Sequence, residues 1–314
     1  MINKSTMLKK NISITAGIAI AISMVVGSGL FALPGLVIEA TDPLTAFAGW
    51  LLVILLMPPM IHIFAFLGQK FPYVGGITLY ASHAVGKWSE GGFSLIICGA
   101  LAVGMPAFFM VGGAYLAELF TLDVDTWYIP LAIVLALVST AMNIAGVDKL
   151  GWANRFVVIS VLVLVIVIAA STFFTHDLTN IQPSKIPDDF SLNIGGIWLA
   201  STIIFWAFQG WENMSFGLEE FEKPERSIPI VFWCSFIFIA LVYFVFALTT
   251  TLTALTGEDV TGLSGLVPLM GTGLQRQIIL TFTVMVLVAN ANSWIFGASR
   301  VFFQQPIKVL CQYI

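Results

Sequence analysis

Two short motifs place glycine beside polar side chains in the middle of long apolar runs. The first is VGSGLF at residues 26–31, inside an apolar run from about residue 12 to 38, and the second is FQGWE at residues 208–212, inside a run from about 194 to 218. Glycine weakens a helix, so each run is predicted to unwind at its motif and to bare peptide N–H and C=O groups. Bare peptide groups at membrane depth are tolerated only where protein or a wet cavity satisfies them. Paired interruptions of this kind are typical of a transporter's substrate site.

The first motif predicts a site for an anion. If the chain unwinds at Gly27, Ser28 and Gly29, the outer half-helix presents free N–H groups at the positive end of its dipole. A substrate carboxylate fits there, and the Ser28 hydroxyl is a further donor. The alternative is that small residues merely let two helices pack closely, which is common in membranes. Taken alone, this motif favours packing, but the second motif reverses that preference.

The second motif predicts the complementary half of the site. Gly210 splits a stretch that is rich in aromatic residues, among them Trp206, Phe208 and Trp211. The half-helix before it would end in unpaired carbonyls, which suit an ammonium group or a cation. Donors for a carboxylate and acceptors for an amine together describe the backbone of an amino acid. Trp206 and Phe208 are candidates for an aromatic gate, with core or lipid-facing packing as the alternative.

Glu212 is the one acidic residue that the pattern places well inside a span. An ionisable group at that depth is costly unless it is paired or protonated, so its presence indicates a function. Glu212 is therefore a candidate proton carrier for coupling. The alternative is a structural carboxylate that bonds to the unwound backbone or to the Ser28 hydroxyl, and the sequence favours neither.

The composition indicates an all-α protein in a lipid bilayer. Hydrophobic residues make up 59% of the chain and charged residues 10%, whereas a soluble domain is roughly half apolar and a quarter charged. A spanning helix needs about 20 apolar residues. A signal peptide is the alternative for the first apolar run, which is too long for one and lacks a clean cleavage site. The predicted eight spans lie near residues 12–38, 44–67, 92–120, 127–145, 152–174, 194–218, 228–253 and 276–303.

Positive charges predict the orientation of these spans. With the N-terminus in the cytoplasm, only Lys185 and Arg276 of the 13 lysines and arginines fall on the outer side. This bias favours cytoplasmic N- and C-termini, and an even number of spans agrees with it. The inner side holds Lys4, Lys9, Lys10, Lys70, Lys87, Lys149, Arg155, Lys223, Arg226, Arg300 and Lys308.

Other classes of protein are disfavoured. The three cysteines lie far apart and predict neither a disulfide framework nor a metal site, and no cofactor is expected. The net charge of -4 does not suggest a nucleic-acid partner. We find no catalytic motif of the kind that would indicate an enzyme. A channel would need a polar lining or a charged ring, for which the spans are too apolar.

Three segments resemble the amino acid-polyamine-organocation superfamily, which has the LeuT-type fold. They are residues 26–31, the loop FPYVGGI at 71–77, and FWAFQGWE at 205–212 continuing to EKPERSIP at 222–229. The resemblance implies a polytopic helix bundle in the cytoplasmic membrane of a bacterium. It also implies one membrane domain over residues 1–314, with a first repeat at about 12–174 and a partial second, inverted repeat at about 194–303.

Within the superfamily, the chain resembles bacterial exporters of methionine and branched-chain amino acids. The segment VGMPA at residues 103–107 and Tyr243 fit that branch. The resemblance implies a secondary transporter or antiporter for neutral amino acids that works by alternating access. The implied contacts are the carboxylate at Ser28 and Gly29, the amine at the carbonyls of Phe208 and Gln209, the gate at Trp206, and a side-chain pocket of Met105, Phe208 and Trp294.

Two departures from the family pattern stand out. Some relatives carry a lysine in the fifth helix that stands in for a sodium ion, whereas the corresponding stretch here, VISV at residues 158–161, is uncharged. The chain also holds only three of the second five helices, and its ending at residues 304–308 breaks from the pattern. We therefore expect a truncated form, and the alternative to a transporter is a fragment that does not transport or only binds partners. Coupling by a proton or cation, transport direction and oligomeric state stay open.

Overall fold

The computed structural model describes residues 11–73, 76–86, 88–144, 150–175 and 193–304. Among these residues the only extended pairing is a single β-bridge between Ile12 and Phe221. Everything else with regular structure is helical, which confirms the predicted all-α class. The helices are α1 (Ile14–Val25), α2 (Ser28–Ala40), α3 (Pro43–Lys70), α4 (Gly76–Val85), α5 (Ser89–Leu119), α6 (Val124–Ile144), α7 (Leu150–Thr175), α8 (Ile194–Ile204), η3 (Phe205–Phe208), α9 (Trp211–Met214), η4 (Ser215–Glu220), α10 (Pro224–Leu255), η5 (Val267–Met270) and α11 (Gly273–Gln304).

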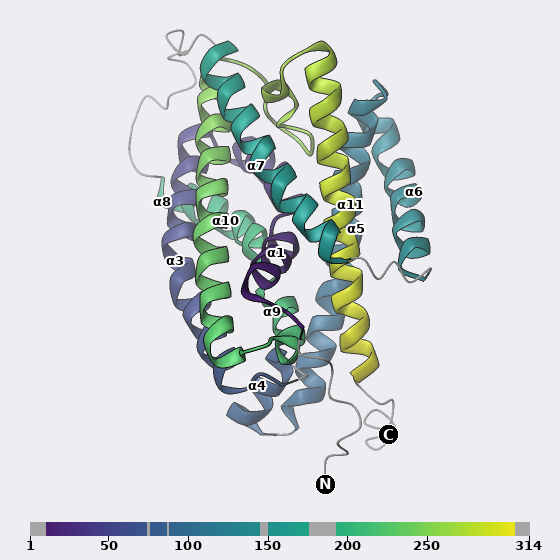
Figure 1. Cartoon of the computed structure of the whole chain (residues 1–314). Coiled ribbons are helices and arrows are strands. Elements are labelled where there is room, and N and C mark those ends of the chain that lie inside the picture. Colours follow the sequence, from purple (N-terminus) through teal and green to yellow (C-terminus); the bar gives the residue numbers. More distant parts are fainter. Residues whose placement is uncertain (1–10, 74–75, 87, 145–149, 176–192, 305–314) are drawn as a thin grey trace.

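The described helices form eight apolar segments long enough to cross a membrane, as predicted. Two of these segments are composite, because α1 and α2 make up the first, and α8, η3, α9 and η4 make up the sixth. Figure 1 shows α1 and α9 in the interior of the bundle, surrounded by longer helices. Helix α1 contacts α7, α9, α10 and α11, whereas α6 lies at the periphery against α5. The first interrupted segment is the most buried of the eight, and the second is buried mainly over α9 and η4.

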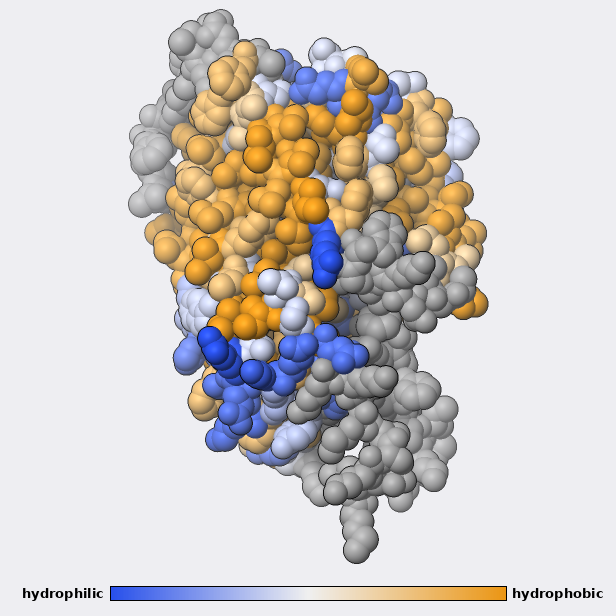
Figure 2. Space-filling model, viewed as in Figure 1, coloured by the Kyte–Doolittle hydropathy of each residue, from blue (hydrophilic) through white to orange (hydrophobic). Residues whose placement is uncertain are grey.

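The exterior of the bundle is apolar over its middle. Figure 2 shows hydrophobic residues across the body of the visible face, with hydrophilic residues gathered mainly toward its ends. Large apolar side chains such as Leu55, Val103 and Ile166 are exposed. Water would disfavour such a surface, whereas lipid tails match it. The chain is a multi-pass membrane protein.

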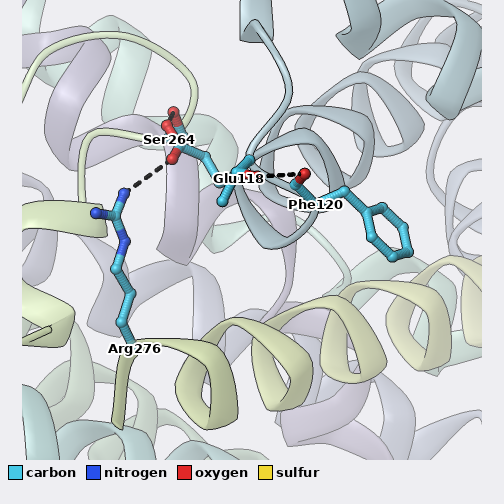
Figure 3. A network of polar contacts seen from close by, with 5 residues as sticks. Glu118, Phe120, Ser264 and Arg276 are labelled. Atoms are coloured by element: carbon cyan, nitrogen blue, oxygen red, sulfur yellow. Dashed lines mark hydrogen bonds and ion pairs between the residues drawn. The ribbon is translucent and has the colours of Figure 1, made fainter. Parts of the chain in front are cut away.

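The end of the bundle opposite α4 carries the connection between α10 and α11, residues 256–272 (Figure 1). Glu118, near the end of α5, accepts hydrogen bonds from Arg276 Nη2 at 2.9 Å and from Ser264 Oγ at 3.3 Å (Figure 3). Gly262 N–H donates to the Glu39 carboxylate of α2 at 3.2 Å. These contacts attach the connection to α2, α5 and α11 together.

At the other end, the chain before α1 pairs with the chain after η4. Ile12 N–H donates to the Glu220 carbonyl at 2.9 Å, and Glu222 N–H donates to the Ile12 carbonyl at 3.2 Å. Gly17 fits this contact because a Cβ there would lie 2.5 Å from the Phe221 ring. The two interrupted segments are thus joined at the ends of their α1 and η4 halves.

Candidate substrate site at two helix breaks

The first span breaks where the glycine motif predicts. Helix α1 ends at Val25 and α2 begins at Ser28, with Val26 and Gly27 in extended conformations between them. The interruption is shorter than predicted, because Ser28 and Gly29 already belong to the first turn of α2. Gly27 is required there for space, since a Cβ would overlap the side-chain amide of Asn290.

The start of α2 presents buried donors. Gly27 caps the helix without a side-chain hydrogen bond. Ser28 is only 2% exposed, and its Oγ has no hydrogen-bond partner among the described residues. The first N–H groups of a helix have no partner within it, and they carry the positive end of the dipole. This combination of donors without a side-chain acceptor is suited to an anion.

The sixth span also breaks as predicted. Helix α8 gives way to the 3-10 turn η3, which ends at Phe208, and α9 begins at Trp211. Gly210 between them has φ of 125°, a left-handed conformation that residues with a Cβ rarely adopt. The glycine therefore allows the chain to turn between the two halves.

The two breaks lie against each other. A Cβ on Gly29 would lie 2.8 Å from the Cα of Ala207, and a Cβ on Gly210 would lie 2.8 Å from the Met24 carbonyl oxygen. The start of α2 thus touches η3, and the start of α9 touches the end of α1. Only residues without side chains permit both approaches.

Side chains from two other helices satisfy the carbonyls at the end of α1. Asn290 Nδ2 of α11 donates to the Ser23 carbonyl at 2.7 Å, and Trp294 Nε1 donates to the Met24 carbonyl at 2.8 Å. The buried Tyr243 hydroxyl of α10 lies 2.7 Å from the Ala207 carbonyl and 3.2 Å from the Val25 carbonyl. Tyr243 therefore links both breaks through one oxygen.

Glu212 lies in the first turn of α9 and is partly buried. Its Oε2 accepts a hydrogen bond from the Gly210 N–H at 3.0 Å. A structural role for Glu212, as the alternative to a proton carrier, predicts such a hydrogen bond between the carboxylate and the unwound backbone. The proton-carrier role of Glu212 stays a prediction.

Aromatic side chains from three elements meet beside the breaks. Phe108 of α5 stacks on Trp206 of η3 with ring centroids 5.8 Å apart, and its ring centroid is 5.4 Å from that of Trp294. Met105 lies three residues before Phe108, so both project from the same side of α5. The predicted residues Trp206 and Trp294 thus both pack on Phe108, and the place of Met105 in the side-chain pocket stays a prediction.

The neighbouring residues Phe208 and Gln209 occupy different environments. The Phe208 side chain is 1% exposed and packs edge-on against Tyr243, with ring centroids 4.9 Å apart. Gln209, at the break itself, is exposed. The substrate contacts of both residues stay predictions, and the packing of Phe208 favours its backbone over its ring for that role.

Three residues of this region were missed from the sequence as site residues: Phe108, Tyr243 and Asn290. Asn290 carried a usable signal, because an amide inside an apolar span needs a polar partner. The sequence marks Tyr243 only as typical of one family branch, and Phe108 has no distinguishing feature in an aromatic-rich chain. Their roles follow from contacts across more than 30 residues of sequence.

The family model described as amino acid permease matches residues 12–305. The L-methionine/branched-chain amino acid exporter YjeH of Escherichia coli is 27% identical over 238 residues, which cover 75% of this chain and 55% of that protein. The uncharacterized amino acid permease YecA of Bacillus subtilis is 26% identical over 254 residues, 80% of this chain and 58% of that protein. The chain thus spans little more than half the length of these relatives. It belongs to the amino acid permease family of the amino acid-polyamine-organocation superfamily.

Proposed function

We propose that this chain is a secondary transporter that moves neutral amino acids by alternating access. The observation that carries the proposal is the start of α2, where buried donors and the unpartnered Ser28 hydroxyl lie against the second break. The positive end of the helix dipole favours an anionic acceptor for those hydrogen bonds, and the carboxylate of an amino acid is such a group. Gly27, Ser28 and Gly29 are the proposed carboxylate subsite.

The second break is the proposed amine subsite. Phe208, Gln209 and Gly210 supply backbone at the end of a half-helix, and its negative dipole end attracts an ammonium group. The distance between the two breaks is short, as the contact of Gly29 with Ala207 indicates. A small zwitterion therefore fits the pair better than an extended ligand.

The side-chain subsite is proposed at Met105, Phe108, Trp206 and Trp294. None of these side chains is charged, which favours neutral, apolar substrates over cationic ones. The printed name of the Escherichia coli relative makes methionine and the branched-chain amino acids the first substrates to test, and export the first direction. We propose a bacterial cytoplasmic membrane with the N-terminus inside, from the distribution of lysine and arginine.

Coupling to a proton is proposed at Glu212. A glutamine in its place would still accept the Gly210 N–H but could not release a proton. Glu212→Gln therefore separates the two roles of the residue without removing its backbone contact. A pH dependence of transport that survives this change assigns Glu212 to structure alone.

The test is counterflow in liposomes that contain the purified full chain. Vesicles loaded with unlabelled methionine are expected to accumulate labelled methionine or leucine, and loading with arginine is expected to give no accumulation. Detergent-solubilised protein supplies the second measurement, binding of labelled methionine. Binding without counterflow would indicate the alternative of a membrane protein that binds but does not transport, and loss of both would refute the proposal.

A further inference from the structure

The end of α1 at the first break is closed by neutral hydrogen-bond donors. A helix leaves its last four carbonyls without intrahelical partners, and those of α1 belong to residues 22–25. Val26 N–H donates to the Ile22 carbonyl, and Asn290 and Trp294 donate to those of Ser23 and Met24. The Tyr243 hydroxyl has one hydrogen, and it lies 2.7 Å from the Ala207 carbonyl and 3.2 Å from the Val25 carbonyl. Three of the four carbonyls thus have a donor of their own.

Such a helix end would otherwise attract a cation. It carries the negative end of the helix dipole, and in transporters built from broken helices the carbonyl ends of half-helices coordinate the coupling ion. The neighbouring hydroxyls of Ser23 and Ser293, 3.3 Å apart, add oxygen atoms of the kind that sodium prefers. A sodium ion and the N–H donors of the protein would therefore compete for the same carbonyl oxygens at the end of α1.

Asn290 occupies the position that a sodium ion would need. Its Nδ2 lies 2.7 Å from the Ser23 carbonyl and 3.3 Å from the Met24 carbonyl, so the amide N–H groups point at both oxygens. The hydrogens of an amide carry partial positive charge and repel a metal cation. The amide also fills the space beside Gly27, where a Cβ would overlap the Asn290 Oδ1.

The acidic residue on the adjacent helix α9 does not supply an oxygen ligand in place of the amide. Glu212 lies on α9, which contacts both α1 and α11. Its carboxylate accepts the Gly210 N–H instead of extending the oxygen cluster. A cation at the end of α1 would therefore have to displace the Asn290 amide without a free carboxylate in exchange.

We infer that Asn290 is a positioning residue that fixes α1 to α11 with a neutral amide and closes this end of α1 to sodium. The inference deepens the proposed function and rests on it for one consequence, that transport does not use a sodium gradient. The closure itself is a property of the junction and can be measured whether or not the chain transports.

The experiment compares thermal unfolding of the full chain in sodium chloride and in choline chloride at equal ionic strength. The wild type is expected to unfold at the same temperature in both salts. Asn290→Asp removes the two N–H donors and places a carboxylate beside the freed carbonyls and the two serine hydroxyls. Sodium is then expected to raise the unfolding temperature of this variant in a saturable way, because a ligand that binds only the folded state stabilises it.

Asn292→Asp is the matched control on the same helix. The Asn292 amide oxygen accepts a hydrogen bond from Asn143 Nδ2 at 2.7 Å, which a carboxylate also accepts. This variant is expected to gain no response to sodium, because its neighbour is an amide and not the end of α1. A folded Asn290→Asp variant without any sodium response would contradict the role assigned to Asn290.

A second measurement on the wild type keeps the inference testable if the variant fails to fold. The dissociation constant for labelled methionine is expected to be the same in sodium and choline. Sodium that stabilises the wild type, or that tightens methionine binding several-fold, would overturn the inference. Absence of methionine binding in both salts would refute the proposed function, while the unfolding comparison would still decide whether sodium binds.

Discussion

The two helix breaks both expose N–H groups at the start of a helix, but they differ in which of these groups already have a hydrogen-bond acceptor. At the first break, the start of α2 has no side-chain cap and the buried Ser28 hydroxyl has no partner. At the second, the carboxylate of Glu212 already accepts the Gly210 N–H in front of α9. Both breaks bare donors at a helix start, yet only one leaves them for a ligand.

This difference indicates a division of roles. A buried donor without a partner costs free energy, on the order of 1–3 kcal/mol, so the first break is less stable than it could be. A ligand that supplies an anionic acceptor recovers that free energy. At the second break, the chain itself satisfies the Gly210 N–H. This asymmetry supports the proposal that the substrate carboxylate binds at the first break.

The largest effect is expected from Gly210→Ala, which tests whether the second break is a fixed turn. A residue with a Cβ at φ of 125° is strained by about 1–3 kcal/mol, and this Cβ would also lie 2.8 Å from the Met24 carbonyl. We expect a clear drop in the unfolding temperature, followed by circular dichroism or a fluorescence-based assay. Gly99→Ala on α5 is the control, because a Cβ there meets nothing within 4 Å. Equal unfolding temperatures for the two variants would contradict the turn.

The smallest effect is expected from Glu212→Gln. The amide oxygen of glutamine accepts the same Gly210 N–H, so the unfolding temperature should change little. Glu212→Ala removes the acceptor and should cost about 1 kcal/mol, as the loss of a helix cap does. If Glu212 carries the coupling proton, as proposed, the pH dependence of methionine exchange should be lost in Glu212→Gln. A pH profile equal to that of the wild type would instead assign Glu212 to structure alone.

Much of the architecture could be predicted from the sequence because its signals are local. Apolar runs fix the eight spans, and glycine with polar neighbours fixes the two breaks at Gly27 and Gly210. The exact extent of the first break was not predictable: Ser28 and Gly29 belong to the first turn of α2, and the space beside Gly27 is filled by Asn290 from a distant helix.

The partners of the breaks could not be predicted because they depend on packing between distant segments. Tyr243 and Asn290 bond to α1 across 218 and 267 residues of sequence, and no local pattern encodes those distances. The environment of the Phe208 ring could not be predicted for the same reason. Its position beside the break suggested a gate, yet its ring packs in the core against Tyr243 and Trp50.

The most direct test of the account is methionine affinity in Ser28→Ala. Because the Ser28 hydroxyl is buried without a partner, its removal relieves an unpaired donor, and the unfolding temperature without ligand should not fall. A hydrogen bond to a charged group contributes about 1.5–3 kcal/mol, so the dissociation constant for methionine should rise about ten- to a hundredfold. Ser235→Ala is the matched control, another buried and unpartnered serine, placed on α10. Unchanged methionine affinity in Ser28→Ala, or an equal loss in both variants, would contradict a carboxylate site at the first break.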